Sequence, residues 1–426
     1  PLLTAGFISM GMDVVLVGPL PTPALPMLIR SLRADLGVMI TASHNTYEYN
    51  GLKFFDSEGY KFNRTIEKKI ENIISSTTKY NKIINLGNIS GKALRLNDAQ
   101  GRYSEYLKST LNNKTIYKNL KVVLDCANGA TYNVAPNLFW ELGCEVIVIN
   151  NIPDGKNINL ECGAVNVTSL SKKVIKEKAD IGFAFDGDGD RVGVVDEKGN
   201  EIFSDKIGLL IARNLSTEYK NSKFIVDVKS TGLFKTDEVL KKNSCKTIYW
   251  KTGHSYIKRK VNEEKSLAGF EKSGHFFFNK PLGLGYDDGI LSAIQVCKLL
   301  DKNSQKKISN LMNELPTTYQ SPTMAPYCSD EEKYKVVGIM IKKFKELFER
   351  KTKITDKFIS EILTINGVRF TLEDGSWGLI RASSNKPSLV IVTESVQSII
   401  EMKAIFNFID NLLKATRKVG KYDQKI

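Results

Sequence analysis

An internal repeat constrains the fold of this chain more than any other feature of its sequence. Residues 122–125 (Val-Val-Leu-Asp) read as a buried strand that leads through a Gly/Asn-rich turn into a helix near 134–142 and a second strand. Residues 224–227 (Phe-Ile-Val-Asp) begin the same succession, with a helix near 234–242. The aspartate at the end of the first strand and the cysteine just before the second strand lie 19 positions apart in the first copy (125 to 144) and 18 in the second (227 to 245). This matching spacing predicts repeated α/β domains.

The chain is too long for one hydrophobic core, because 426 residues normally fold as about two to four domains. A helix at 22–32 before a short apolar strand looks like part of a further α/β unit, and a charged helix at 330–351 begins a smaller last unit that ends in a helix at 398–413. The sequence starts without methionine, in what reads as the middle of a helix, so we expect a missing N-terminal segment. We expect four domains, with the bounds 1–96, 97–198, 199–315 and 316–426.

The composition excludes some classes of function. A formal charge of +14 suits either nucleic acid or an anionic small substrate. The lysines are scattered among acids, as in residues 65–71, and no helix-turn-helix, zinc-finger or RNA-stacking signature is present, which argues against nucleic acid. The six cysteines form no C-x-x-C pair, so we expect reduced thiols and a cytoplasmic location. The apolar opening at 1–20 has no basic start and contains Asp13, so it predicts neither a signal peptide nor a membrane span.

The most chemically informative segment is Asp186-Gly187-Asp188-Gly189-Asp190-Arg191. Three carboxylates this close repel one another unless a cation neutralises them, and oxygen ligands without nearby Cys or His suit Mg²⁺ or Ca²⁺. Residues 179–185 and 192–195 read as strands, whereas an EF-hand needs flanking helices and a glycine where Arg191 stands. The pattern therefore favours Mg²⁺ over Ca²⁺. The alternative is a solvated acidic turn.

A second candidate segment, Thr41-Ala42-Ser43-His44-Asn45, follows the apolar strand at 37–40. It would present the Ser43 hydroxyl at the carboxyl end of that strand, where α/β proteins bind ligands. Lys53 follows soon after and offers a cation to a phosphate group. Read alone, Ser43 is as well explained by a helix cap or a turn, and Lys53 by solvation.

The remaining candidates are the three histidine motifs and a polar loop near the C-terminal end of the sequence. Each of the three histidines lies in a compact polar motif: His44 beside Ser43, His254 in Lys-Thr-Gly-His-Ser, and His275 in Glu-Lys-Ser-Gly-His. Glu271 and Ser273 of the last motif can accept and donate hydrogen bonds to sugar hydroxyls, although a plain hairpin turn is the alternative. The loop 381–387, Arg-Ala-Ser-Ser-Asn-Lys-Pro, combines a guanidinium, hydroxyls, an amide and an ammonium, which suits a phosphate.

Taken together and in this order, these motifs resemble the α-D-phosphohexomutases. In that family a T-A-S-H-N-P loop carries a phosphorylated serine, D-G-D-G-D-R holds Mg²⁺, a G-E-x-S-G-H loop reads sugar hydroxyls, and a C-terminal loop binds the substrate's phosphate. The resemblance spans nearly the whole chain. It implies three similar α/β domains with mixed sheets and a smaller α+β C-terminal domain around a central cleft.

The resemblance also assigns roles residue by residue. The residues that it assigns to catalysis are Ser43, His44, Lys53, Arg191 and His275. Those that it assigns to substrate binding are Lys229, His254, Glu271, Ser273, Arg381, Ser383 and Asn385. The metal ligands that it implies are Ser43, Asp186, Asp188 and Asp190.

The implied reaction interconverts hexose 6-phosphate and hexose 1-phosphate. Phosphoserine at Ser43 would pass its phosphoryl group to the sugar, and the resulting bisphosphate would turn round and return the other phosphate. The resemblance implies Mg²⁺ as cofactor and a hexose 1,6-bisphosphate as activator. It implies a phosphorylated hexose as the substrate. We expect a monomer or homodimer, with neither nucleic acid nor a membrane as a partner.

Some features depart from the family pattern. Thr46 stands where the family usually has proline, and Asn385 where threonine is commoner. The first half, including the segment Asp125-Cys126-Ala127-Asn128-Gly129-Ala130, looks closer to phosphoglucosamine mutases, whereas Lys251–Ser255, Gly285–Gly289 and Trp377–Ser383 look like phosphomannomutase/phosphoglucomutase. A join of two genes near the acidic loop is a hypothesis that explains the difference.

The sugar-reading and phosphate-reading loops lie in the second half, so the sequence favours mannose and glucose phosphates. Phosphoglucosamine mutase is the alternative. A truncated sugar-phosphate-binding protein without turnover is another, because family members begin with a segment that is absent here.

Overall fold

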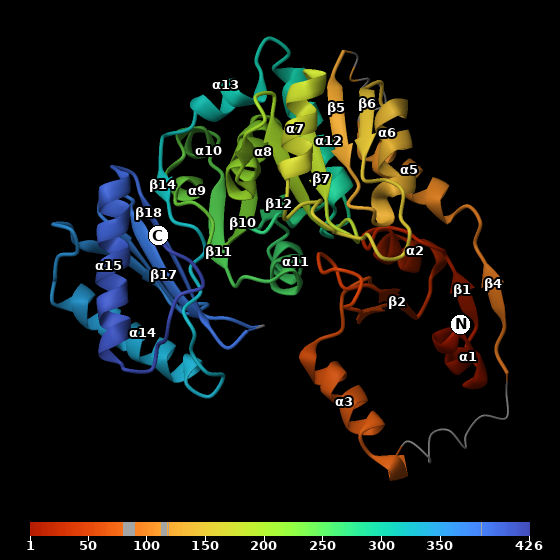
Figure 1. Ribbon diagram of the computed structural model, residues 1–426, viewed down its shortest axis with the longest axis horizontal. Helices are drawn as coiled ribbons and strands as arrows, with labels where there is room; N and C mark the ends of the chain where they lie inside the picture. The colour runs from red at the N-terminus through yellow and green to blue at the C-terminus, as the bar shows by residue number, and fades with distance from the viewer. Residues whose placement is uncertain (80–89, 112–116, 118, 385) are drawn as a thin grey trace. The chain divides into compact units, whose positions relative to one another are not determined.

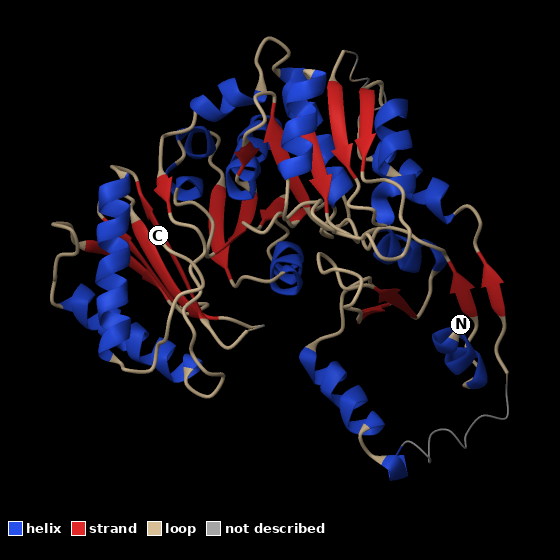
Figure 2. Cartoon of the chain, viewed as in Figure 1, coloured by secondary structure: helices blue, strands red, loops and turns tan. Residues whose placement is uncertain are grey.

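The computed structural model describes residues 1–79, 90–111, 117, 119–384 and 386–426 (Figure 1). The chain forms two compact units: residues 1–202 with 280–302, and residues 203–279 with 303–426. Strands and helices occur in both (Figure 2). Three α/β domains with mixed sheets and a C-terminal domain with an antiparallel sheet make up the fold, as the sequence predicts. The bounds at 96, 198 and 315 stay predictions.

A five-stranded sheet of the first unit contains the first copy of the repeat. Its strands lie in the order β6-β5-β7-β8-β9. Their bounds are β5 (Lys121–Asp125), β6 (Glu145–Ile149), β7 (Ile181–Phe185), β8 (Val192–Asp196) and β9 (Glu201–Ile202). Strand β5 is parallel to β6 and β7, whereas β8 runs antiparallel to β7. The buried strands β7 and β8 are apolar almost throughout, as expected for strands covered on both faces.

Helices cover this sheet and complete its core. Their bounds are α5 (Ala99–Ser109), η1 (Ala130–Asn133), α6 (Ala135–Glu141), α7 (Thr168–Glu177) and α12 (Gly289–Lys302). Helix α7 buries Leu170 and Val174 against Val123 and Val195, and α6 lies beside β6 (Figure 1). The helix expected near 134–142 is therefore present, preceded by the short η1.

The second unit repeats the arrangement in a four-stranded sheet of order β11-β10-β12-β13. Its strands are β10 (Lys223–Asp227), β11 (Lys246–Trp250), β12 (Ala268–Phe270) and β13 (Phe276–Phe278). Again the first strand is parallel to two neighbours, and the last strand is antiparallel. The helices are α8 (Ser204–Glu218), α9 (Leu233–Thr236), α10 (Glu238–Lys242), α11 (His254–Glu263) and α13 (Ile308–Asn313).

The single helix expected near 234–242 is wrong, because the segment forms two short helices. Asp237 separates α9 from α10 in an extended conformation (φ −57°, ψ 123°), and its carboxylate accepts a hydrogen bond from the Leu240 N–H. The same carboxylate pairs with Arg213 at 2.6 Å. Asp237 therefore caps a new helix instead of continuing the old one, which is the usual preference of aspartate.

The N-terminal α/β domain has its strands in two small sheets. Strand β1 (Val14–Leu16) pairs with β4 (Ala93–Arg95) in parallel, and β2 (Leu36–Ile40) pairs with β3 (Leu52–Asp56) in antiparallel fashion. Its helices are α1 (Leu2–Ser9), α2 (Ala24–Leu32) and α3 (Arg64–Ile74). Helix α2 packs Leu25 and Ile29 against Phe55. Within the described residues, neither α1 nor α3 buries a side chain fully.

The C-terminal domain is a five-stranded antiparallel sheet of order β14-β18-β17-β16-β15 covered by two helices. The strands are β14 (Tyr319–Gln320), β15 (Ile359–Leu363), β16 (Val368–Leu372), β17 (Trp377–Ala382) and β18 (Leu389–Ser395). The helices are α14 (Lys333–Glu349) and α15 (Ile399–Ala415). Phe344 of α14 stacks on Phe370 of β16 with ring centroids 4.4 Å apart. The predicted α+β domain with its charged and final helices is confirmed.

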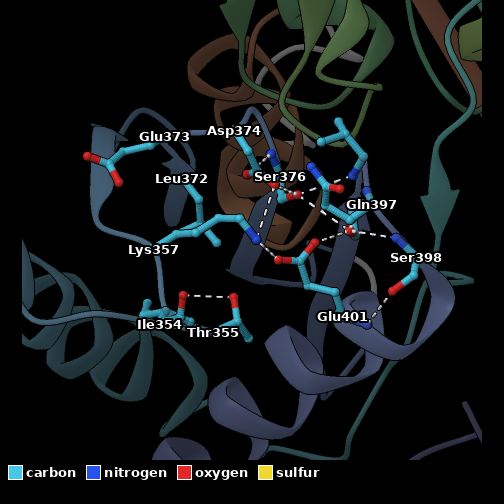
Figure 3. Close-up of polar contacts among 12 residues, drawn as sticks. Ile354, Thr355, Lys357, Leu372, Glu373, Asp374, Ser376, Gln397, Ser398 and Glu401 are labelled. Carbon is cyan, nitrogen blue, oxygen red and sulfur yellow. Dashed lines mark hydrogen bonds and ion pairs between the residues drawn. The ribbon is translucent and has the colours of Figure 1, made fainter.

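A polar network fixes the start of α15 to the turn between β16 and β17 (Figure 3). The Ser398 hydroxyl accepts a hydrogen bond from the Glu401 N–H at 3.1 Å, which caps the helix. The Glu401 carboxylate pairs with Lys357, and Lys357 also lies 3.4 Å from Asp374 in the turn. Ser376 donates to Asp374 at 3.0 Å. Charge pairing therefore joins three segments that are distant in the sequence.

All six cysteines are free thiols. Among the described helices, none combines the length and the apolar character that a bilayer crossing requires.

Candidate functional site

Three loops of the α/β domains occupy the same topological place. Each joins a strand to the antiparallel strand that follows it: residues 41–51 join β2 to β3, residues 186–191 join β7 to β8, and residues 271–275 join β12 to β13. Strand β7 is parallel to β5, and β12 is parallel to β10, so the latter two loops leave the carboxyl ends of parallel strands. Ligands of α/β proteins bind at such ends. These are the loops whose sequences predicted chemistry.

The acidic loop 186–191 gathers its three carboxylates around one point. Asp186, Asp188 and Asp190 are each at most 4 % exposed, and one oxygen from each lies within 4.8 Å of the others. The Asp188 Oδ1 atom is buried and accepts no hydrogen bond from the described residues. Oxygen atoms gathered in this way suit a hard divalent cation such as Mg²⁺. The donor set therefore fits the ion that the sequence predicted.

Two cations offset part of this negative charge. Lys53 of β3 places its Nζ 2.7 Å from Asp188 Oδ2 and 2.9 Å from Asp190 Oδ2, and Arg191 Nε lies 3.6 Å from Asp186 Oδ2. Burial disfavours the charged lysine, but the charges of Asp190 and Asp188 outweigh that effect and raise the pKa of Lys53 well above its ordinary value. Lys53 is thus a permanent cation. These two cations offset part of the charge of the three carboxylates, and a divalent ion would offset more of it.

Ser43 lies at this acidic loop. Its hydroxyl donates a hydrogen bond to Asp186 Oδ2 at 2.8 Å, although the two residues are 143 positions apart. Its backbone has φ 55°, a left-handed conformation that is unusual for serine. The Ser43 N–H donates to Thr41 Oγ1 at 2.8 Å. His44, the next residue, is exposed. The structure therefore brings together Ser43, Lys53, Arg191 and the three aspartates.

Two threonines to which the sequence assigned no role complete the surroundings of Asp188. The hydroxyls of Thr22 and Thr41 donate to Asp188 Oδ2 at 2.7 and 2.9 Å. The Thr22 N–H also donates to the Asp188 carbonyl at 2.8 Å. With Lys53, these donors occupy one oxygen of Asp188 and leave the other for a cation. Nothing in the sequence spacing signals Thr22, which precedes Asp188 by 166 positions.

In the second unit, the loop 271–275 places a buried carboxylate among polar groups. Glu271 is 2 % exposed, accepts a hydrogen bond from the Gly253 N–H at 3.0 Å and another from the Ser273 hydroxyl at 2.9 Å. Burial raises the pKa of Glu271, and the neighbouring His275 opposes that rise. The rings of His254 and His275 stack with centroids 5.3 Å apart. Two of the three histidines thus meet at this loop.

The candidate phosphate-binding residues lie in the same unit. Arg381, in β17, is 8 % exposed, and its Nε forms no hydrogen bond with the described residues. Burial lowers the pKa of Arg381, while the charges of Asp227 and Glu271 oppose that change. Lys229 Nζ is 3.8 Å from Asp227 Oδ2. Ser383 accepts a hydrogen bond from the Lys386 N–H at 3.2 Å. Asn385 lies outside the described residues.

Comparison with known proteins agrees with this arrangement. Three family profiles match the chain: "Phosphoglucomutase/phosphomannomutase, alpha/beta/alpha domain I" at residues 1–81, domain II at 101–199 and domain III at 203–319. A phosphoglucosamine mutase of Caldicellulosiruptor bescii is 44 % identical over 313 residues, which cover 72 % of this chain and 68 % of that protein. One of Clostridium kluyveri is 39 % identical over 343 residues, or 78 % of this chain and 74 % of that protein.

Solved structures extend the similarity along the chain. A phosphoglucomutase/phosphomannomutase family protein of Burkholderia thailandensis superposes with a TM-score of 0.81 and 27 % identity, and covers 99 % of this chain and 87 % of that one. A structure titled as a phosphomannomutase from Thermus thermophilus has a TM-score of 0.73 at 22 % identity, covers 97 % of this chain and 86 % of that one, and bears on the fold alone.

Proposed function

Since this chain belongs to the α-D-phosphohexomutase family, whose members are intramolecular phosphotransferases, we propose that it interconverts glucosamine 6-phosphate and glucosamine 1-phosphate through a phosphoserine at Ser43. The observation that supports this most strongly is the hydrogen bond of 2.8 Å between the Ser43 hydroxyl and Asp186 Oδ2. A serine at an acidic, oxygen-only cation site has the surroundings that phosphoryl transfer requires.

The reaction needs two phosphoryl transfers. In the first, the bond between phosphorus and Ser43 Oγ breaks, a bond to a sugar hydroxyl oxygen forms, and the hydroxyl proton ends on Ser43 Oγ. Asp186 Oδ2 accepts that proton in a hydrogen bond when the serine is unmodified. In the second, the other phosphate of the bisphosphate returns to Ser43. Lys53 and Arg191, which pair with the three aspartates, would offset charge on the transferred group.

Asp186, Asp188, Asp190 and an oxygen of the modified Ser43 would hold Mg²⁺. When bound, the ion supplies a positive charge that makes the phosphorus electrophilic and stabilises negative charge in the transition state. The chain's own residues position its ligands. Thr22, Thr41 and Lys53 occupy Asp188 Oδ2, so that Asp188 Oδ1 is available.

We propose that residues of the second unit bind the sugar and the phosphate of the substrate. Glu271 and Ser273 would bind sugar hydroxyls, because a carboxylate and a hydroxyl together accept and donate hydrogen bonds. Arg381 and Lys229, with Ser383 and Asn385, would bind the phosphate that does not react, since a guanidinium matches phosphate geometry. The proposal keeps His44, which is exposed, and His275 as candidate catalytic residues. It keeps His254 as a candidate substrate-binding residue.

The identity of the sugar is the point at which sequence motifs and relatives differ. The motifs of the second half favour mannose and glucose, whereas the curated relatives quoted above are phosphoglucosamine mutases at 39–44 % identity. Identity at that level over most of the chain is the stronger support, so glucosamine phosphate is proposed first. Glucose and mannose phosphates remain the second candidate, because the phosphoglucomutase/phosphomannomutase family protein covers 99 % of the chain.

A coupled assay on the full-length natural protein tests the proposal. Glucosamine 1-phosphate, glucose 1-phosphate and mannose 1-phosphate are compared at equal concentration, with Mg²⁺ and the matching bisphosphate activator. We expect the highest kcat/KM for glucosamine 1-phosphate, loss of turnover in Ser43→Ala, and normal turnover in Ser75→Ala, a serine exposed at the end of α3. A higher kcat/KM for mannose 1-phosphate would support the second candidate. No turnover with any of the three sugar phosphates would instead support a sugar-phosphate-binding protein without catalytic activity.

A further inference from the structure

Ser43 is held in a conformation that its own backbone does not favour. At φ 55° its side chain crowds the backbone, and residues in this region persist only where neighbouring contacts compensate. The Ser43 N–H is held by Thr41 Oγ1 at 2.8 Å, and the Ser43 hydroxyl by Asp186 at 2.8 Å. The remaining polar group of Ser43 is its backbone carbonyl. A hydrogen bond to this carbonyl would hold the third polar group of the residue and so fix its backbone conformation.

That partner is Asn159, from the loop between β6 and α7. Its Nδ2 donates to the Ser43 carbonyl at 2.9 Å and to the Asn45 carbonyl at 2.8 Å, so both amide hydrogens serve the serine loop. Two carbonyl acceptors require a donor, which fixes the orientation of the amide. Asn159 is 7 % exposed, and its own N–H donates to the Ala127 carbonyl at 2.9 Å. The side chain is thus buried and anchored at its base.

Asn159 also contacts the acidic loop. A Cβ added at Gly187 would lie 2.6 Å from Asn159 Nδ2 and 2.7 Å from the Ser43 carbonyl oxygen. Gly187 stands between the metal-ligand candidates Asp186 and Asp188. The absence of a side chain at Gly187 therefore lets Asn159 and the serine loop pack directly on the backbone of the acidic loop.

We infer that Asn159 is a positioning residue for phosphoryl transfer: its amide group fixes the backbone of Ser43 so that the serine oxygen stays at the three aspartates. Asn159 acts through the Ser43 and Asn45 carbonyls, to which its amide group donates. The inference rests on the proposed phosphoserine at Ser43. An error of about 1 Å in the position of a reacting group costs on the order of 100-fold in rate, so a residue of this kind has a measurable effect.

Asn159→Asp in the full chain is the sharpest variant. Aspartate keeps the size and the tolerance for a left-handed backbone, which Asn159 has at φ 56°. It replaces a donor by an acceptor that faces two carbonyl oxygens. The matched control is Asn128→Asp. Asn128 has φ 47°, donates to the Asn157 carbonyl at 3.4 Å and accepts from the Ile152 N–H, contacts that leave the serine loop untouched.

The first measurement is the rate at which a hexose 1,6-bisphosphate phosphorylates Ser43, followed by peptide mass spectrometry. We expect Asn159→Asp to be slower than wild type by on the order of 100-fold at about pH 8. Asn128→Asp should stay within about 2-fold of wild type.

The second measurement does not depend on activity. Asn159→Gly removes the amide without straining the backbone, and hydrogen exchange of the peptide 41–50 should then accelerate at least about 10-fold over wild type while the peptide 121–125 is unchanged. Equal Ser43 phosphorylation rates in Asn159→Asp and wild type, or unchanged exchange at 41–50 in Asn159→Gly, would overturn the inference. A wild-type protein that never phosphorylates Ser43 would overturn the proposed function instead.

Discussion

Replacing Lys53 by methionine should reveal how strongly the acidic loop depends on positive charge. The ammonium group lies 2.7 and 2.9 Å from two carboxylates that are at most 5 % exposed, and the lysine side chain itself is 15 % exposed. Methionine keeps the length of the stem and removes the charge. Removing one partner of a buried ion pair typically costs about 3–5 kcal/mol, because the other charge stays buried without compensation. We expect a loss of that order in Lys53→Met without metal.

Divalent metal should reverse this loss more than it stabilises the wild type. Without Lys53, the site loses one of the two cations that oppose three carboxylates, so its attraction for a divalent ion increases. A ligand at about 100 times its dissociation constant adds about 2.7 kcal/mol to the stability of the state that binds it. Mg²⁺ should therefore restore most of the lost stability in Lys53→Met.

The assay is urea-dependent hydrogen exchange of peptides from β2 and β3, with Mg²⁺ or with a chelator. Local exchange is preferable to one global transition, because the chain has two compact units. The control is Lys61→Met, since Lys61 pairs with Glu67 at 3.5 Å with both side chains more than a quarter exposed. Such pairs contribute about 0–1 kcal/mol. If Lys53→Met loses no more stability than Lys61→Met, or if Mg²⁺ stabilises both equally, the electrostatic reasoning is refuted.

Three further predictions concern ionisable side chains elsewhere. Burial raises the pKa of Asp288 to about 7 from an ordinary 3.8, although the Tyr103 hydroxyl hydrogen-bonds to it at 2.8 Å. Since the folded state then binds more protons than the unfolded state, stability should fall by at most about 4 kcal/mol as pH rises from 4 to 8, and Asp288→Asn should flatten that dependence in urea titrations. Arg369→Lys should destabilise by about 2–4 kcal/mol in the same titrations, because the guanidinium lies 3.7 Å from the Trp377 ring centroid and donates to two carbonyls. Lys357→Met should lower the thermal midpoint of the C-terminal domain at low salt and less at high salt, as scanning calorimetry can measure.

The sequence predicted local structure well wherever short-range pattern decides it. The acidic segment lies between two strands because the short apolar runs on either side have the length and composition of buried strands. Asp125 and Asp227 mark the ends of two parallel strands in similar sheets. The approach of Ser43 to Asp186 also follows from sequence, but only through the order of motifs, because no spacing rule joins residues 143 positions apart.

The contacts that position the site could not be predicted. Thr22 and Asn159 sit in segments without a chemical signature, and their importance comes from hydrogen bonds made across 166 and 116 positions. The break between α9 and α10 depends on the pairing of Asp237 with Arg213, a tertiary contact that overrides helix periodicity. The division of β1–β4 and β2–β3 into two sheets is likewise invisible to local pattern.

Mass spectrometry of Ser43 tests the central claim most directly. The full-length protein is incubated with glucosamine 1,6-bisphosphate, with and without Mg²⁺, and its peptides are mapped for phosphate. The arrangement of Ser43 against Asp186, Asp188 and Asp190 predicts one phosphoryl group, on the peptide that contains Ser43, formed with Mg²⁺ and lost on addition of glucosamine 6-phosphate. Turnover without any phosphate on that peptide, or phosphate stably attached at another residue, would contradict it.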